Sequence, residues 1–229
     1  NCIIINYMRS YSLKDCSNNQ IDYRLDKLFN KENGFYIELG ANDGLKQSNT
    51  AFFEFFKNWT GVLIEPCTSA FEKCKLNRPK SSCYNNACVS NEYTDDFVRG
   101  DFDTEHLMSS VNALRKSGGR RDINTLPKVS ATTLEKILNQ EKIIEKNIKI
   151  DLLSLDTEGY ELNILKGLNL NVYRPKYMLI EVYTFDFDNI VQFLKENNYS
   201  LLCNFSNYSK KTNPRWDGTH NDYLFIDNN

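Results

Sequence analysis

The chain has 229 residues, of which 41% are hydrophobic and 25% are charged, and its formal net charge is −2. This composition is typical of a soluble globular protein with a substantial core, and the length suits one large domain or a domain with an insertion. A net charge near zero excludes a general attraction to nucleic acid or to anionic membranes, and no run of about 18 apolar residues is present. We therefore expect no nucleic-acid partner and no membrane span.

The cysteines point to a reducing compartment. There are seven of them, an odd number, and none forms the C-x-x-C spacing of zinc sites or redox dithiols. The first residues, 1–5, are too short for a signal-peptide core. We expect free thiols and a cytoplasmic location. Because the chain begins without Met, it is also open that it is one piece of a longer polypeptide.

The first half of the chain predicts alternating strands and helices after a helical or irregular segment at 1–34. The apolar run Phe35 to Leu39 ends at Gly40, which is typical of a buried parallel strand. Further strands are predicted at 61–64 and 83–89. Helices are predicted at 48–59 and 68–77, the second ending before a proline.

The region at about 91–128 interrupts this alternation. It is polar, contains two consecutive glycines at 118–119 and lacks sustained apolar periodicity. A loop of this length inside a compact domain is usually functional or mobile. We interpret it as a lid or a substrate-binding insertion in a domain that spans 35–229.

Regular alternation returns in the last third of the chain. The pair Thr132-Thr133 has the residue type of a helix N-cap, and a helix is predicted from there to about 140. The predicted elements that follow are strands at 150–155, 177–182, 199–203 and 223–226, with helices ending near 167 and at 187–197. Such alternation predicts an α/β fold with a mostly parallel sheet covered by helices on both faces.

A glycine turn follows the first predicted strand, in the segment Glu38 to Gly44 (ELGANDG). Its small residues allow a ligand to approach the backbone closely. The pattern lacks the third glycine of dinucleotide sites, which argues against a nicotinamide dehydrogenase. The acidic residue at the strand end suits a cationic ligand such as the amino or sulfonium group of S-adenosylmethionine. A purely structural glycine turn is the alternative.

Two further acidic positions follow predicted strands. Glu65 ends the next strand, where a carboxylate is able to accept hydrogen bonds from two ribose hydroxyls; the alternative is a solvated carboxylate before a proline turn. Asp156, Glu158 and Glu161 follow the strand at 150–155, at the sheet edge where ligands bind. These carboxylates are suited to holding a metal, orienting a hydroxyl or acting as a general base. For Glu161, inside the predicted helix, we expect only a capping role.

Taken together, these segments resemble the FkbM family of methyltransferases. The similarity runs in order through Ile37–Gly44, Trp59–Pro66, Asn77–Pro79, Val129–Leu134, Ile150–Glu161, Leu165–Gly167 and Asn221–Phe225. The resemblance implies a Rossmann-like class I methyltransferase fold, with a seven-stranded sheet and an antiparallel final hairpin. It also implies S-adenosylmethionine as the methyl donor and a hydroxyl of a sugar or natural product as the acceptor.

The resemblance implies a role for each matching residue. The residues expected around the methionine part of the cofactor are Glu38, Gly40, Asn42, Asp43 and Gly44. Glu65 is expected at the ribose, and Asn86 and Ala87 beside the adenine. Asp156 is expected at both the cofactor and the reacting groups, and Glu158 at the methyl group and acceptor.

Removal of the acceptor's hydroxyl proton requires a base. The chain has two histidines, His106 and His220, whose ordinary pKa near 6.5 suits this task, and Asp156 or Glu158 is the competing candidate. Asp156 and Glu158, with a third oxygen ligand, are also candidate ligands for Mg²⁺, which would hold the acceptor hydroxyls. The aromatic side chains considered for stacking on a sugar are Trp216, Tyr160 and Tyr183.

Our leading hypothesis is therefore an S-adenosylmethionine-dependent O-methyltransferase acting on a hydroxyl of a sugar or glycan, as a single protein or as one domain of a longer glycan-modifying polypeptide. Two alternatives stay open. One is methylation of a non-sugar small molecule, a lipid or an RNA ribose. The other is a Rossmann-like binding module without catalytic activity.

Overall fold

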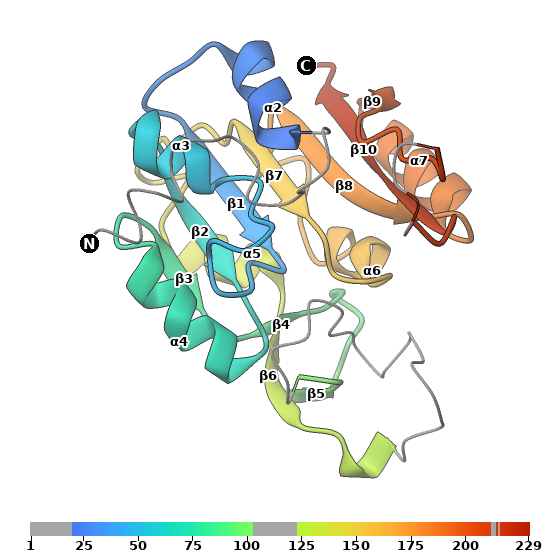
Figure 1. Ribbon diagram of the computed structural model, residues 1–229. Coiled ribbons are helices and arrows are strands. Elements are labelled where there is room, and N and C mark those ends of the chain that lie inside the picture. Colours follow the sequence, from blue (N-terminus) through green and yellow to red (C-terminus); the bar gives the residue numbers. More distant parts are fainter. Residues whose placement is uncertain (1–19, 103–122, 212–213, 215) are drawn as a thin grey trace.

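The computed structural model describes residues 20–102, 123–211, 214 and 216–229. A seven-stranded sheet forms its centre, with the strand order β3-β2-β1-β7-β8-β10-β9 (Figure 1). Its strands are β1 (Phe35–Leu39), β2 (Thr60–Ile64), β3 (Ser82–Tyr84), β7 (Leu152–Leu155), β8 (Tyr177–Tyr183), β9 (Tyr199–Asn204) and β10 (His220–Asp227). β10 runs antiparallel to both β8 and β9, whereas the other pairings are parallel. This arrangement confirms the predicted class I methyltransferase fold.

Helices cover both faces of this sheet (Figure 1). They are α2 (Ile21–Phe29), α3 (Ala51–Phe56), α4 (Thr68–Asn77), α5 (Leu134–Gln140), α6 (Glu161–Leu165) and α7 (Phe187–Glu196). Side chains alternate along each strand, so Tyr36 packs in one cluster with α2 and α3 while Ile37 packs in another with α5, α6 and α7. The predicted N-cap is confirmed, because Thr133 accepts a hydrogen bond from the backbone N–H of Lys136 at 3.2 Å.

The N-terminal helix α2 is part of the domain core. Ile21 and Leu25 are buried in the same cluster as Trp59 and the sheet residues Leu179 and Leu224. Residues 1–19, the rest of the predicted N-terminal segment, lie outside the described residues.

A second, three-stranded sheet stands beside the carboxyl edge of the first. It consists of β4 (Ala87–Cys88), β6 (Lys128–Thr132) and β5 (Phe97–Arg99) in the order β4-β6-β5. The strand predicted at 83–89 is therefore divided into β3 and β4. The side chain of Asn85 donates to the carbonyl oxygens of Glu65 and Pro66 at 2.9 Å each, which turns the chain between the two sheets.

The predicted insertion contains regular structure as well. β5 pairs antiparallel with β6, and a short 3-10 helix spans Ile123–Thr125. Both elements are only three residues long, too short to produce a visible periodicity in the sequence. Residues 103–122, with the candidate base His106, lie outside the described residues.

Two further predicted boundaries were wrong. α3 is shorter than the predicted 48–59 because Ser48 and Thr50 direct their side chains to Glu38, and Asn58 has a left-handed backbone with a φ of 54°. β10 begins three residues before the predicted strand at 223–226, because His220, Asn221 and Asp222 pair with β8. The local pattern of apolar residues does not indicate this pairing with β8.

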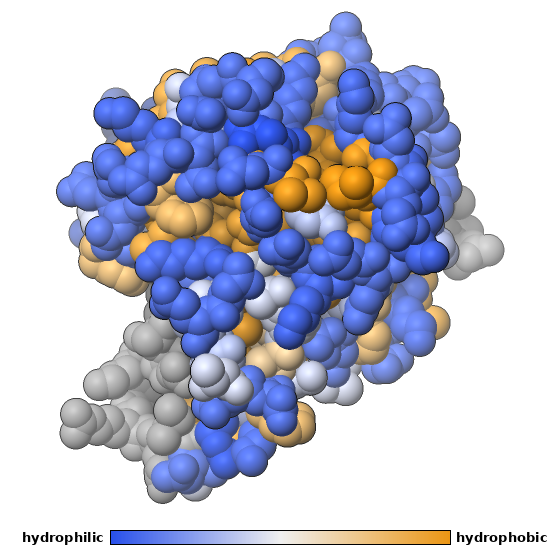
Figure 2. All heavy atoms as spheres, turned by 180° about the vertical axis from the view of Figure 1, so that it is seen from behind, coloured by the Kyte–Doolittle hydropathy of each residue, from blue (hydrophilic) through white to orange (hydrophobic). Residues whose placement is uncertain are grey.

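Polar side chains dominate the surface seen from behind, where hydrophobic residues form only limited groups (Figure 2). Among the described helices, none is both long and apolar enough to cross a membrane.

Candidate active site

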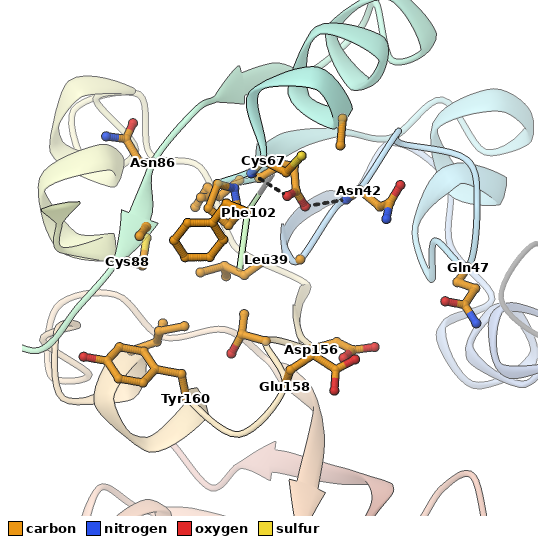
Figure 3. Close-up of a pocket in the computed structure, with 18 of the residues that line it drawn as sticks. Leu39, Asn42, Gln47, Cys67, Asn86, Cys88, Phe102, Asp156, Glu158 and Tyr160 are labelled. Carbon is orange, nitrogen blue, oxygen red and sulfur yellow. Dashed lines mark hydrogen bonds between the residues drawn. The ribbon is translucent and has the colours of Figure 1, made fainter. Parts of the chain in front are cut away.

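A pocket lies at the carboxyl ends of β1, β2 and β7 and extends to β4 (Figure 3). Three loops build most of it. The turn after β1 contributes Gly40 and Asn42, the end of β2 contributes Glu65, and the loop after β7 contributes Asp156 and Glu158. Parallel strands that end at one edge bring these loops together, as the sequence predicted for this fold.

Gly40 allows the first and third loops to approach each other. A Cβ atom at this position would lie 1.9 Å from the backbone oxygen of Asp156, and the glycine has a φ of 78°. No side chain fits there, and other residues rarely adopt this backbone conformation. The first glycine of the ELGANDG segment is therefore required by close packing of the two loops.

Glu65 is held by backbone donors at the pocket wall. Its carboxylate accepts hydrogen bonds from the N–H groups of Asn42 and Cys67, both at 2.8 Å. Burial raises the pKa of Glu65 to about 7, although the two N–H groups oppose this shift and Asp43 adds to it. A solvated carboxylate, the alternative considered from the sequence, does not describe this residue, which is only 7% exposed.

The far end of the pocket is mostly apolar. Asn86 and Ala87, the residues expected at the adenine, line it together with Ile64, Cys88 and Phe102. The ring of Phe102 is buried and points into the pocket (Figure 3). The sequence did not reveal Phe102, because it stands in the insertion without a motif or a periodic neighbour.

Glu38, Asp43 and Gly44 do not line the pocket; they support it from behind. The carboxylate of Glu38 accepts hydrogen bonds from the hydroxyls of Ser48 at 2.8 Å and Thr50 at 2.6 Å, and from the N–H of Asn49 at 2.9 Å. Asp43 caps its own turn by accepting from the N–H groups at 45 and 46. Direct contact of these three residues with a methionine group stays a prediction of the resemblance.

Arg78 anchors the same loop from α4. Its guanidinium is fully buried and donates to the backbone oxygen of Gly44 at 2.9 Å and to Ser48 Oγ at 3.1 Å. It also pairs with Glu54 at 3.0 Å and approaches Glu38 to 3.5 Å. Burial by itself lowers the pKa of Arg78, but Tyr36 and these two carboxylates raise it overall, so the group stays charged. The Asn77–Pro79 segment matched the family without any indication of this role.

Three carboxylates converge beside the pocket. Oxygen atoms of Asp156, Glu158 and Glu181 all lie within 4.8 Å of one another, a grouping able to hold a metal ion. Glu158 has a left-handed backbone with a φ of 60°, and its carboxylate accepts a hydrogen bond from the hydroxyl of Tyr183 at 2.7 Å. Glu181 was missed in the sequence because it stands inside the apolar run of β8, opposite Asp222 of β10.

The candidate base His220 stands next to this cluster. It is the first residue of β10 and pairs with Tyr183 of β8. Its Nε2 lies 3.6 Å from Glu181 Oε1, and its Nδ1 lies 3.5 Å from Asp217 Oδ1. The backbone oxygen of His220 accepts a hydrogen bond from the indole N–H of Trp216 at 2.8 Å. Antiparallel pairing of the last strand thus brings residue 220 to the loop at 156–158.

Glu161 serves the loop itself. It is the first residue of α6, and its carboxylate accepts hydrogen bonds from the N–H groups of Thr157 at 2.8 Å and Gly159 at 3.1 Å. Burial raises the pKa of Glu161 to about 7, against the effect of these hydrogen bonds. The side chain is thus occupied with backbone groups of the loop that precedes α6, rather than with the helix N-terminus that the sequence led us to expect.

Comparison with known families identifies the fold and its chemistry. A family model described as the methyltransferase FkbM domain matches residues 38–201, which is most of the chain. The chain belongs to this family. Membership makes the protein a methyltransferase with S-adenosylmethionine as the methyl donor, and the matched range includes both Glu65 and the loop at 156–158. No sequence among the curated proteins matches the chain.

The solved structures that are similar to this chain include two methyltransferases. One is a precorrin-6y C5,15-methyltransferase from Geobacter metallireducens, with a TM-score of 0.46, 10% identity, and coverage of 93% of this chain and 90% of that one. Another is an S-adenosylmethionine-dependent methyltransferase from Thiobacillus denitrificans in complex with S-adenosylhomocysteine, with a TM-score of 0.44, 9% identity and 98% coverage of each chain.

Proposed function

We propose that this FkbM-family protein is an O-methyltransferase that methylates a hydroxyl of a sugar or glycan. The observation that supports this choice is the group of carboxylates Asp156, Glu158 and Glu181 beside the cofactor pocket, with His220 at its edge. A neutral hydroxyl is a weak nucleophile, so its methylation benefits from groups that orient it and accept its proton. Carboxylates and an imidazole are such groups.

The residues around the pocket fit S-adenosylmethionine. Gly40 leaves its turn without a side chain where the loops meet, and Glu65 presents a buried carboxylate suited to two neighbouring ribose hydroxyls. Ile64, Cys88 and Phe102 supply apolar walls for the adenine. When bound, the cofactor supplies an electrophilic methyl group on a sulfonium.

We propose that the protein's own residues accept the proton of the acceptor hydroxyl and position that hydroxyl. Asp156 or Glu158 accepts the hydroxyl proton, or His220 does so when its imidazole is neutral. Tyr183 holds the Glu158 carboxylate in place through its 2.7 Å hydrogen bond. Orientation of the hydroxyl along the line of displacement contributes several kcal/mol to lowering the barrier.

We also propose a divalent cation at the same carboxylates, with Glu181 as the third oxygen ligand beside Asp156 and Glu158. Three carboxylates within 4.8 Å repel one another unless protons or a cation neutralise them. Mg²⁺ prefers carboxylate oxygens and retains positions for water or substrate hydroxyls. Bound there, the ion would lower the pKa of an acceptor hydroxyl.

Two neighbouring thiols support a cytoplasmic location. Cys74 and Cys83 remain thiols although their sulfur atoms lie only 3.9 Å apart. Whether the protein acts alone or as one domain of a longer glycan-modifying polypeptide is tested by the size of the native protein on an immunoblot of source-cell extract. A species much larger than 26.7 kDa would support the second case.

Methyl transfer is tested with isotopically labelled S-adenosylmethionine and a panel of free sugars and glycans, with products identified by mass spectrometry. We expect a sugar that gains one labelled methyl group in an alkali-stable ether linkage. Glu158→Gln should lower kcat at least 100-fold. Asp188→Asn, which removes a carboxylate from the first turn of α7, should leave kcat unchanged. Binding of the cofactor without transfer to any sugar would contradict the proposal and favour another acceptor or a binding module.

The cation is tested separately by repeating the assay after chelation and after addition of Mg²⁺. We expect activity to fall with chelation and to return with Mg²⁺, and Glu181→Gln to raise the Mg²⁺ concentration required for half-maximal activity. Full activity of the chelated protein would contradict the cation while leaving the methyltransferase proposal intact.

A further inference from the structure

The turn between β8 and α7 exposes an aromatic ring close to the carboxylates. Phe185 has 74% of its surface exposed. Its ring stacks on that of Tyr183, with 5.7 Å between centroids and 28° between planes. A Cβ atom at Gly159 would lie 3.5 Å from Phe185 Cζ, so the ring also lies over the turn that follows Glu158. Phe185 therefore borders the loop that lines the pocket.

Tyr183 connects this ring to the reacting groups. Its hydroxyl donates to Glu158, and its ring lies 5.3 Å from the imidazole of His220. Because Tyr183 is buried, the stack has a fixed inner member and an exposed outer member. The apolar ring of Phe185 thus lies close to the carboxylate oxygens of Glu158, and Tyr183 contacts both.

The fold itself does not use the Phe185 ring as core. The neighbouring Phe187 performs that task, since it packs against the main core cluster and lies 4.9 Å from the ring of Tyr223. Exposure of a large aromatic side chain provides no folding stability from burial. Its position next to a pocket and a carboxylate cluster instead indicates contact with a ligand.

The charged groups near Phe185 favour some ring-shaped ligands over others. Asp156, Glu158 and Glu181 cluster beside Tyr183, whose hydroxyl donates to Glu158, and the half-buried Asp186 follows Phe185 in the chain. Four carboxylates exceed the charge of one divalent cation, and the negative charge that remains disfavours the phosphates of an RNA acceptor. A pyranose has C–H groups for the aromatic face and hydroxyls for the carboxylates, and it carries no charge.

We propose that Phe185, supported by Tyr183, is the platform on which the acceptor's pyranose ring stacks, so that one ring hydroxyl faces Glu158. This inference rests on the proposed sugar O-methyltransferase function and adds to it a binding site for the acceptor ring. It also makes Phe185 a determinant of acceptor affinity that takes no part in cofactor binding.

Ligand-observed NMR tests this binding without requiring turnover. The full chain, saturated with S-adenosylhomocysteine, is mixed with a set of methyl pyranosides, and the protein's aromatic protons are irradiated selectively. We expect saturation to reach the ring C–H protons of at least one pyranoside and to be lost in Phe185→Ala. Phe56→Ala, which removes an exposed phenylalanine from α3, is the matched control and should retain the signal.

Kinetics then distinguish an acceptor platform from a structural role. With the pyranoside that binds, Phe185→Ala should raise the acceptor KM about tenfold or more, with little change in kcat or in the dissociation constant of S-adenosylmethionine. Phe185→Trp should restore acceptor affinity because it retains an aromatic face. An altered cofactor affinity or melting temperature in Phe185→Ala would indicate a structural role and overturn the proposal.

Further outcomes distinguish the Phe185 platform from the sugar O-methyltransferase function. Methylation of a pyranoside with the same KM in the wild type and in Phe185→Ala would overturn the platform while leaving the proposed function intact. Saturation transfer to ribonucleosides and none to pyranosides would overturn the choice of a sugar ring. Absence of both binding and methylation for every pyranoside would count against the proposed function and overturn the platform with it.

Discussion

Glu65 combines two backbone hydrogen bonds with nearly complete burial. The donors at Asn42 and Cys67 orient the carboxylate at the pocket wall, while burial raises its pKa to about 7. The free protein is therefore a mixture of protonated and ionised Glu65 near neutral pH. Only the ionised form would be able to accept hydrogen bonds with both oxygens from the two ribose hydroxyls that we propose as its partners.

This predicts a pH-dependent affinity for the ribose. As the pH falls from about 8 to about 6, Glu65 becomes protonated, and affinity should fall by up to about tenfold per pH unit below 7. Adenosine is the suitable ligand for calorimetry, because it lacks the ionisable amino acid group of the cofactor. Glu65→Gln should bind more weakly at every pH and show no such slope; an equal slope in this variant would assign the effect to another group.

Gly40 is the second position where one residue determines the site. In Gly40→Ala the new Cβ meets the Asp156 backbone at 1.9 Å, in addition to the strain of a positive φ. We expect a loss of more than about 2 kcal/mol in the free energy of unfolding, together with loss of cofactor binding. Urea denaturation and calorimetry provide the measurements.

Gly218→Ala is the matched control for Gly40→Ala. It shares a positive φ of 89° but has no atom within 4 Å of the added Cβ. It should lose only the strain contribution, about 1 kcal/mol, and retain cofactor binding. Equal losses in the two variants would show that contact between the loops is unimportant.

Whole helices and strands, as well as individual residues, hold the site in place. The C-terminal end of α4 supports the turn after β1, because Arg78 donates to the backbone of Gly44 and Asn77 donates to the oxygen of Asp43 at 2.8 Å. The same arginine neutralises Glu54 and Glu38 in the interior. Helix α4, the turn and strand β1 therefore form one unit behind the pocket.

Removal of the Arg78 charge should weaken this unit strongly. Arg78→Met leaves two buried carboxylates without their cation, and we expect the free energy of unfolding to fall by about 3–5 kcal/mol. Lys75→Met replaces an exposed residue of the same helix, and its free energy of unfolding should stay within about 0.5 kcal/mol of the wild-type value. If Arg78→Met is too unstable to purify, Arg78→Lys provides the comparison; wild-type stability in either would contradict the role assigned to Arg78.

At the scale of the whole molecule, the pocket lies among three loops from β1, β2 and β7 and a fourth wall from β4 and Phe102. A ligand that contacts all of these segments stabilises the folded domain relative to the unfolded chain. Binding is therefore linked to global stability, and the linkage does not depend on the identity of the acceptor.

Thermal unfolding with S-adenosylhomocysteine tests this linkage. At a ligand concentration about 100 times the dissociation constant, the folded state gains about 2.7 kcal/mol, which corresponds to a rise in Tm of about 5–10 °C for a domain of this size. NAD should give no rise, and Glu65→Ala should reduce the rise given by S-adenosylhomocysteine. A larger shift with NAD would contradict the cofactor assignment.

The strands and helices of the sheet were predictable because their signals are local. Apolar runs such as Phe35–Leu39 indicate buried strands, Gly40 indicates the turn that follows, and Thr133 is a recognisable N-cap. The positions of Glu65 and Asp156 followed from the same logic, since residues after parallel strands meet at one edge. The amino-acid sequence by itself thus determined the fold class, the family and the location of the pocket.

Only the tertiary structure decided which side chains share the site. Glu181 stands in an apolar strand and Phe102 in an insertion, so neither carries a local signal. Antiparallel pairing of β10 with β8 brings His220 to Glu181. Glu38 matched its motif, yet folding directs its carboxylate to Ser48, Asn49 and Thr50 behind the pocket. The reason is that side-chain partners come from strand order and packing between distant segments, which local periodicity does not specify.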